Sequence, residues 1–301
     1  MVRRDFQDPE NCKAVTKKAD NTILKRLKEE GKKRGLTPRL LEFYERLFRI
    51  QSGAEQKIAS LPGPSLSSEA ISKRIEHGLP MVSFDKLAID WSILKAIFTE
   101  VIVLFADYPD LLGDLPKNLR ERRSHPALPK KVVKAWYEKT KVSSTTAISD
   151  DNEYLLLEAI IHATLKPFLT SCSKALLSLV NQEQWRRQFC PICGGQPDFA
   201  FLDKEHGGRW LLCSRCDAEW LFQRLQCPYC GNQNQDDLAY FTDDEGVYRL
   251  YVCEQCHSYI KAIDLRCTES KVSLPLERVL TLDIDRQAQQ KGYIGLPILK
   301  P

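Results

Sequence analysis

The chain has 301 residues, of which 43% are hydrophobic and 28% are charged. This composition is typical of a folded globular protein and excludes a disordered chain. The formal net charge of +4 is too small to indicate a nucleic-acid partner unless the charge is unevenly distributed.

The charge is divided between two parts of the chain. Residues 1–189 hold 32 Lys and Arg against 24 Asp and Glu, a balance of +8. Residues 190–267 hold 7 against 12, a balance of −5, and the remaining residues hold 5 against 4. We therefore expect two regions of different electrostatic character.

The first half of the chain predicts helices. The basic segment 1–35 is expected to be a solvated, partly frayed helical extension. Apolar residues at helical spacing then predict a helical domain over residues 36–187. Its predicted helices cover residues 40–50, 68–79, 84–105, 130–137 and 154–180. Pro167 predicts a kink in the last of them.

The residue pattern of the sequence changes at residue 190, where prolines, glycines and aromatic residues replace the helical periodicity. We assign residues 188–267 to a tandem metal-binding region and residues 268–301 to a C-terminal tail with one short helix-like run and no assigned function. Short strands are predicted at 210–212, 219–225, 248–252 and 259–265.

Eight of the eleven cysteines form four Cys-x-x-Cys pairs. The chain begins with charged residues rather than an apolar leader, and no uncharged apolar run reaches about 18 residues. These features predict a cytoplasmic protein without a membrane span, and paired thiols in a reducing compartment are typical of metal ligands. The candidate ligands are Cys190, Cys193, Cys213, Cys216, Cys227, Cys230, Cys253 and Cys256.

The spacing of the pairs favours two consecutive modules, 190–216 and 227–256. Within each module 19 or 22 residues separate the two pairs, enough for a hairpin, and 10 residues separate the modules. Four thiolates suit tetrahedral zinc or a single iron, and the ligand set does not distinguish these metals. A crosswise pairing of the modules is sterically possible and stays open at this point.

Other residues give weaker signals. Glu158 and His162 lie four apart on a predicted helix, but two ligands alone make a weak site, and a hydrogen-bonded core histidine is the simpler interpretation. The lone Cys172 fits a small buried apolar residue. His257 could replace a sulfur, although four cysteines are already present in its module.

The sequence favours a binding protein over an enzyme. It has no catalytic triad or phosphate-binding loop. Cysteine side chains occupy all four coordination positions of each predicted metal, which leaves no open position for a substrate. The acidic character of residues 190–267 opposes phosphate binding, so we expect a protein partner rather than nucleic acid. A homo-oligomer is compatible with these features.

Longer motifs surround the cysteine pairs. They are CPICGGQP from Cys190, RWLLCSRCDAEW from Arg209, CPYCG from Cys227 and CEQC from Cys253. Through these motifs the chain resembles the FdhE family of formate dehydrogenase accessory proteins. The segment SHPALP at 124–129 is compatible with this resemblance, which extends from about residue 40 to the end of the chain.

The resemblance implies a cytoplasmic accessory or assembly factor for respiratory formate dehydrogenase that contacts its catalytic subunit. It also implies two mononuclear iron sites at the eight cysteines, with zinc as the alternative. The expected fold is an N-terminal helical bundle followed by two rubredoxin-like or zinc-ribbon-like four-cysteine modules. A rubredoxin-like electron carrier and a zinc-ribbon nucleic-acid-binding protein are the alternative functions.

Overall fold

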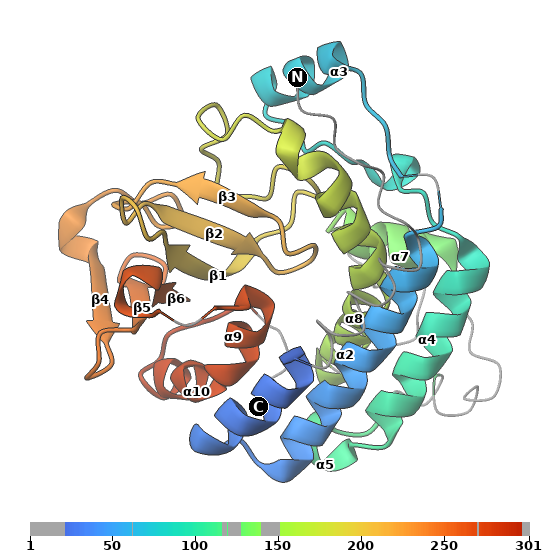
Figure 1. Cartoon of the computed structure of the whole chain (residues 1–301), viewed down its shortest axis with the longest axis horizontal. Helices are drawn as coiled ribbons and strands as arrows, with labels where there is room; N and C mark the ends of the chain where they lie inside the picture. Colours follow the sequence, from blue (N-terminus) through green and yellow to red (C-terminus); the bar gives the residue numbers. More distant parts are fainter. Residues whose placement is uncertain are drawn as a thin grey trace.

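The structure is a computed structural model that describes residues 22–61, 63–115, 119, 128–139, 151–269 and 271–296. Helices and a single sheet form two sides of the molecule, and the C-terminal helices lie between them (Figure 1). Cys12 and most of the segment 124–129 lie outside the described residues.

Three long helices pack against one another in the first half of the chain: α2 (Pro38–Ile58), α4 (Trp91–Ala106) and α8 (Asp151–Leu176). Three shorter helices accompany them: α3 (Ser68–Glu76), α5 (Pro109–Leu112) and α7 (Lys130–Tyr137). Fully buried side chains such as Phe43, Phe98 and Leu165 fill the space between the long helices. The predicted helical bundle is thus confirmed.

One predicted helix begins later than expected. Residues 84–105 were expected to be continuous, but Phe84–Lys86 form a short 3-10 helix (η1) and α4 begins at Trp91. The Asp90 side chain accepts hydrogen bonds from the backbone N–H groups of Ser92 (2.8 Å) and Ile93 (3.1 Å). This N-cap satisfies amide groups that would otherwise lack partners, and it fixes the start of the helix.

The basic N-terminal segment is not a solvated extension where the structure describes it. Residues 22–33 are helical, and Leu27 is fully buried in a cluster with Leu276 and Leu280 near the C-terminus. Arg26 Nη2 lies 2.6 Å from the buried carboxylate of Glu277. The expected helix is confirmed for residues 22–33, whereas the expected full solvation is wrong, because their apolar side packs against a distant part of the chain that periodicity alone does not reveal.

The second half forms one six-stranded sheet with the order β3-β2-β1-β6-β5-β4. Its strands are β1 (Pro197–Leu202), β2 (Arg209–Cys213), β3 (Glu219–Phe222), β4 (Leu238–Thr242), β5 (Tyr248–Cys253) and β6 (Ser258–Asp264). Each module contributes three antiparallel strands, and the modules are joined where β1 pairs in parallel with β6. The four predicted strands are confirmed, whereas β1 and β4 were missed.

The C-terminal tail is part of the folded protein. Helices α9 (Leu274–Leu280) and α10 (Leu282–Gln290) lie against the sheet, next to the N-terminal helices (Figure 1). The buried Lys261 of β6 donates hydrogen bonds to the carbonyl groups of Arg278 (3.0 Å) and Thr281 (3.1 Å), and it forms an ion pair with Asp285. These contacts anchor both helices to the middle of the sheet.

Helical and cysteine-rich regions share one core. The largest cluster of buried apolar side chains contains residues of α2, α4 and α8 together with Cys190, Cys193, Cys213 and Cys216. Among the described residues, the stretch Tyr154–Leu179 is long and apolar enough to cross a membrane, but 67% of its apolar window is buried inside the protein. Such burial is typical of a core helix.

Candidate metal centres

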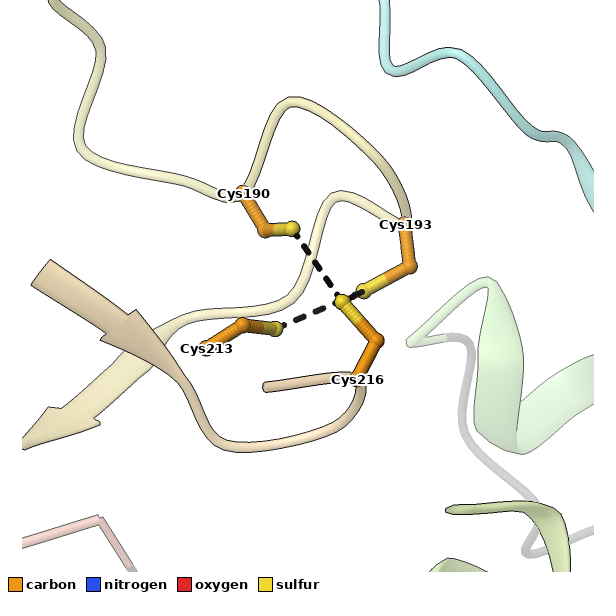
Figure 2. Close-up of side chains that lie close together, drawn as sticks. All are labelled: Cys190, Cys193, Cys213 and Cys216. Carbon is orange, nitrogen blue, oxygen red and sulfur yellow. Dashed lines mark hydrogen bonds between the residues drawn. The ribbon is translucent and has the colours of Figure 1, made fainter. Parts of the chain in front are cut away.

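The first sulfur cluster joins the two cysteine pairs of the first module. The Sγ atoms of Cys190 and Cys216 lie 3.5 Å apart, and Cys193 Sγ lies 3.5 Å from both Cys213 Sγ and Cys216 Sγ. All four side chains are buried and point toward one centre (Figure 2). A disulfide would need a separation of about 2.05 Å, so these cysteines are free thiols.

The second cluster repeats the arrangement in the second module. Sγ atoms lie 3.7 Å apart in the pairs Cys227/Cys256 and Cys230/Cys253. This cluster is more open, because the Cys230 side chain is exposed and Cys256 is half-buried. The grouping confirms the predicted consecutive pairing and rules out the crosswise alternative.

Both clusters fit a four-coordinate metal ion. A metal about 2.3 Å from four thiolates at tetrahedral corners requires sulfur atoms about 3.8 Å apart. The observed separations of 3.5–3.7 Å are close to this value. Either cluster could therefore hold zinc or iron, and ligation by the eight cysteines remains a prediction.

The local backbone explains why the sulfur atoms converge. The residue after the second cysteine of every pair has a positive φ: 68° at Gly194, 54° at Asp217, 80° at Gly231 and 52° at His257. This left-handed residue closes each turn, and glycine adopts it without steric cost. Asp217 is held in this conformation by ion pairs with Lys166 (2.7 Å) and Arg278 (2.9 Å).

Backbone amides donate hydrogen bonds to the sulfur atoms, and burial and neighbouring thiols shift the pKa values of the cysteines. The N–H groups of Ile192, Arg215 and Tyr229 donate to a cysteine Sγ at 3.3–3.4 Å. Burial raises the pKa of the Cys190 thiol, whereas hydrogen bonds from the other thiols hold the pKa of Cys193 well below its usual range. A bound cation would favour the thiolate form of all four sulfurs, because its charge compensates theirs.

The helical region holds the first cluster from two sides. The guanidinium group of Arg215 donates to the carbonyl groups of Tyr137 (2.9 Å) and Trp136 (3.1 Å), and it lies 4.3 Å from the centroid of the Trp136 ring. Met81 and Val82 donate backbone hydrogen bonds to the carbonyl groups of residues 191 and 192. The first cluster is thus built into the core, through contacts that no sequence motif predicts.

His162 has a packing role. Its Nε2 lies 2.9 Å from the carbonyl oxygen of Ser214, which can only accept a hydrogen bond, so the proton is on Nε2. Burial and the nearby Lys166 lower the pKa of His162 to about 3, which keeps the ring neutral. The interpretation of His162 as a hydrogen-bonded core histidine is confirmed, and it joins no metal-ligand group among the described residues.

Three other single residues do not join either group of four cysteines. Cys172 is buried on α8, as expected for a small apolar residue. Cys267 is exposed at the end of the 3-10 helix η5 (Leu265–Cys267). His257 occupies the turn after Cys256 but is not among the four grouped residues.

Comparison with known proteins agrees with this architecture. A family model described as the central domain of FdhE matches residues 189–224, which contain the whole first cluster. A protein named FdhE homolog from Aquifex aeolicus (strain VF5) is 27% identical over 260 residues, 85% of each chain. Over most of its length the chain is similar to a protein of the FdhE family. The predicted recognition is therefore confirmed.

Further members of the FdhE family show how far the similarity extends. Protein FdhE from Escherichia coli O127:H6 is 27% identical over 110 residues, 36% of this chain and 35% of the relative. The crystal structure of the FdhE protein from Pseudomonas aeruginosa superposes with a TM-score of 0.57 at 20% identity, covering 94% of this chain and 97% of that one. This match shows that the two chains share one fold.

Gly195 offers a test of the first cluster. A Cβ atom added there would lie 2.9 Å from Cys213 Sγ and 3.0 Å from the Arg215 side chain. Because buried sulfur atoms cannot move away freely, Gly195→Ala should displace Cys213 and lower the metal content by about one ion per chain. Gly53→Ala, where a Cβ would meet no atom within 4 Å, is the control. Metal analysis of both purified variants checks this, and full metal content in Gly195→Ala would contradict it.

Proposed function

We propose that this chain is a non-catalytic accessory factor for the maturation of a respiratory formate dehydrogenase. In this role it binds the catalytic subunit of the enzyme in the cytoplasm and carries two mononuclear iron sites. Similarity to the FdhE family is the observation that carries the proposal.

The chemistry of the clusters supports a role without catalysis. Each cluster supplies four protein sulfurs, so a bound metal would have no open position for a substrate. Iron held in this way would supply a one-electron couple, whereas zinc would be redox-inert. The acidic character of the cysteine-rich region supports a protein partner and opposes a nucleic acid.

Affinity capture tests the proposed partner. The tagged full-length chain, purified without oxygen, is mixed with the purified catalytic subunit of a formate dehydrogenase from the same organism. We expect a complex that survives size-exclusion chromatography, and no complex with a small subunit of the same enzyme. Metal-loaded protein that binds neither subunit would overturn the proposal.

The exposure of the second cluster supports one alternative function, that of a rubredoxin-like electron carrier. Cys230 is exposed, so electrons could reach an iron at this cluster more readily than at the buried first cluster. Metal analysis and visible absorption of protein from the native host distinguish iron sites from zinc sites. Two irons per chain support the iron sites, and two zinc ions exclude them. Reversible reduction by a physiological redox partner would favour the electron carrier.

A further inference from the structure

The two modules are structural repeats, and this repeat leaves one sheet edge uncovered. Strands β1, β2 and β3 of the first module correspond to β4, β5 and β6 of the second. The pairs Leu202↔Arg209 and Thr242↔Arg249 occupy the same place in the two modules. By this correspondence, Ala200 and Phe201 are equivalent to Tyr240 and Phe241.

Equivalent edges of the two modules have different surroundings. The outer side of β1 is covered by β6, which pairs with it in parallel over residues 199–202. Within the part of the chain that the structure describes, no strand pairs with the outer side of β4, and β4 lies at the far end of the sheet (Figure 1). At the opposite end of the sheet, the side chain of Gln182 accepts a hydrogen bond from Leu221 of β3, so that edge is partly occupied.

The backbone of β4 presents hydrogen-bonding groups outward. Asp243 donates to the carbonyl of Tyr248 across the β4–β5 pair, and Glu254 donates to the carbonyl of Asp237. Because the direction of backbone groups alternates along an antiparallel strand, Tyr240 and Thr242 turn their N–H and C=O groups away from β5. An added strand could pair with these groups.

The side chains of this edge are unusually apolar for solvent. Tyr240 is 55% exposed and Phe241 is 43% exposed, whereas the equivalent Ala200 and Phe201 are buried beneath their neighbours. An exposed apolar edge strand favours uncontrolled pairing unless another chain covers it or charges protect it. Arg249 and Lys291 lie 5.2 and 4.5 Å from the ring centroids of Tyr240 and Phe241, yet both aromatic side chains stay exposed, which favours a surface that another chain covers.

Acidic residues flank both ends of β4. Asp236 and Asp237 belong to the 3-10 helix η4 (Gln235–Asp237) just before the strand, and Asp243, Asp244 and Glu245 form the turn after it. All of these except Asp237 are exposed. An extended segment with basic residues at both ends and apolar residues in the middle would match this pattern in charge and in hydrogen bonding.

We infer that the outer edge of β4 is a docking site for an extended segment of a partner protein, which adds to the sheet as a strand parallel to β4. The segment has a mainly apolar centre and Lys or Arg at each end. It lies beside the more open second cluster, since Leu238 of β4 pairs directly with Cys253. This inference rests on the proposed function only in one respect, namely that the molecule bound at this edge is a protein.

Strand β6 supplies the probe, because it covers the equivalent edge within the chain itself. A fluorescent peptide, KKSYIKAIKK, places the β6 residues 258–263 between basic ends. The acidic control peptide is EESYIKAIEE. Fluorescence anisotropy with the metal-loaded full-length chain should show binding of the basic peptide that weakens with added salt, and binding of the acidic peptide about tenfold weaker or absent.

A proline variant tests the backbone pairing. Thr242→Pro removes an outward N–H group but none of the hydrogen bonds to β5, since proline is tolerated where the N–H group of an edge strand faces outward. Loss of this group and the clash of the ring should weaken binding of the basic peptide about tenfold. An unchanged metal content and melting temperature would show that the variant is folded.

Charge reversal tests the flanking acids. Asp244→Lys with Glu245→Lys should weaken the basic peptide severalfold, whereas Glu205→Lys, in the equivalent turn of the first module, should leave binding unchanged. The inference is overturned if the basic peptide does not bind, if Thr242→Pro binds it normally, or if wild-type chains pair with each other through this edge. If the catalytic subunit still binds in those cases, only the docking site is wrong and the proposed function stands.

Discussion

Removing one ligand from each sulfur cluster should have very different consequences for the fold. Cys216→Ser removes a fully buried predicted ligand from a cluster that lies in the main hydrophobic core. A structural metal contributes on the order of 10 kcal/mol to a small thiolate site, so its loss should unfold the first module and destabilise the helices packed on it. We expect little soluble protein, or a melting temperature at least 10 °C lower.

Cys230→Ser should be tolerated better, because Cys230 is exposed and its cluster lies at the edge of the protein. The variant should lose about one metal ion per chain and keep the helical content of the wild type. Cys267→Ser changes an exposed cysteine outside both clusters and is the control. Metal analysis, circular dichroism and thermal melting of the three variants provide the test, and equal destabilisation by Cys216→Ser and Cys230→Ser would contradict it.

The pairing of the cysteines was predictable because each Cys-x-x-Cys turn fixes two sulfurs locally. A hairpin of suitable length then brings two such turns together, and the residues needed for the turns, Gly194 and Gly231, are visible in the sequence. The identity of the long helices was predictable for a similar reason. Apolar residues at a spacing of three and four define a buried face without knowledge of what covers it.

The two missed strands lack the pattern that predicts a half-buried strand. Five of the six residues of β1 are buried, on both faces of the sheet, and four of the five residues of β4 are exposed. Neither strand therefore alternates between apolar and polar residues. The parallel pairing of β1 with β6 was also invisible, because it joins residues about 60 positions apart through backbone groups that every residue has.

The embedding of the first cluster depends on contacts that sequence distance conceals. In the sequence, Arg215 looks like an ordinary basic residue of a turn. Its guanidinium group nevertheless donates hydrogen bonds to carbonyl groups 78 and 79 positions earlier in the chain. The C-terminal tail likewise gave only a short helical signal. The tail is held in the fold by Arg278 and Glu277, whose buried charges form ion pairs with Asp198 and Arg26.

Arg278→Ala should be among the most destabilising substitutions outside the clusters. Its Nε lies 2.7 Å from Asp198 Oδ2, its Nη1 lies 2.9 Å from Asp217 Oδ1, and its Nη2 donates to the carbonyl of Cys213 at 3.1 Å. Without Arg278, the two buried carboxylates would lose a shared counter-charge. Removing one partner of a buried ion pair costs about 3–5 kcal/mol of unfolding free energy. Urea denaturation measures this loss.

The pH dependence separates an electrostatic cause from a simple loss of packing. In the wild type, burial alone would raise the pKa of Asp217, but the charges of Lys166 and Arg278 outweigh it and hold that pKa below its usual range. A depressed carboxyl pKa stabilises the fold above the unfolded value and loses this effect as pH falls. The deficit of Arg278→Ala should therefore shrink below about pH 4, where carboxyl groups take up protons.

Two further variants complete the test. Asp198→Asn in the Arg278→Ala background removes the carboxylate that has lost its ion-pair partner, so it should recover part of the lost stability. Arg286→Ala, which changes an exposed arginine on the neighbouring α10, should alter the unfolding free energy by less than about 0.5 kcal/mol. A deficit that is independent of pH and unaffected by Asp198→Asn would show that Arg278 acts by packing, and that α9 is not held to the first module by charge.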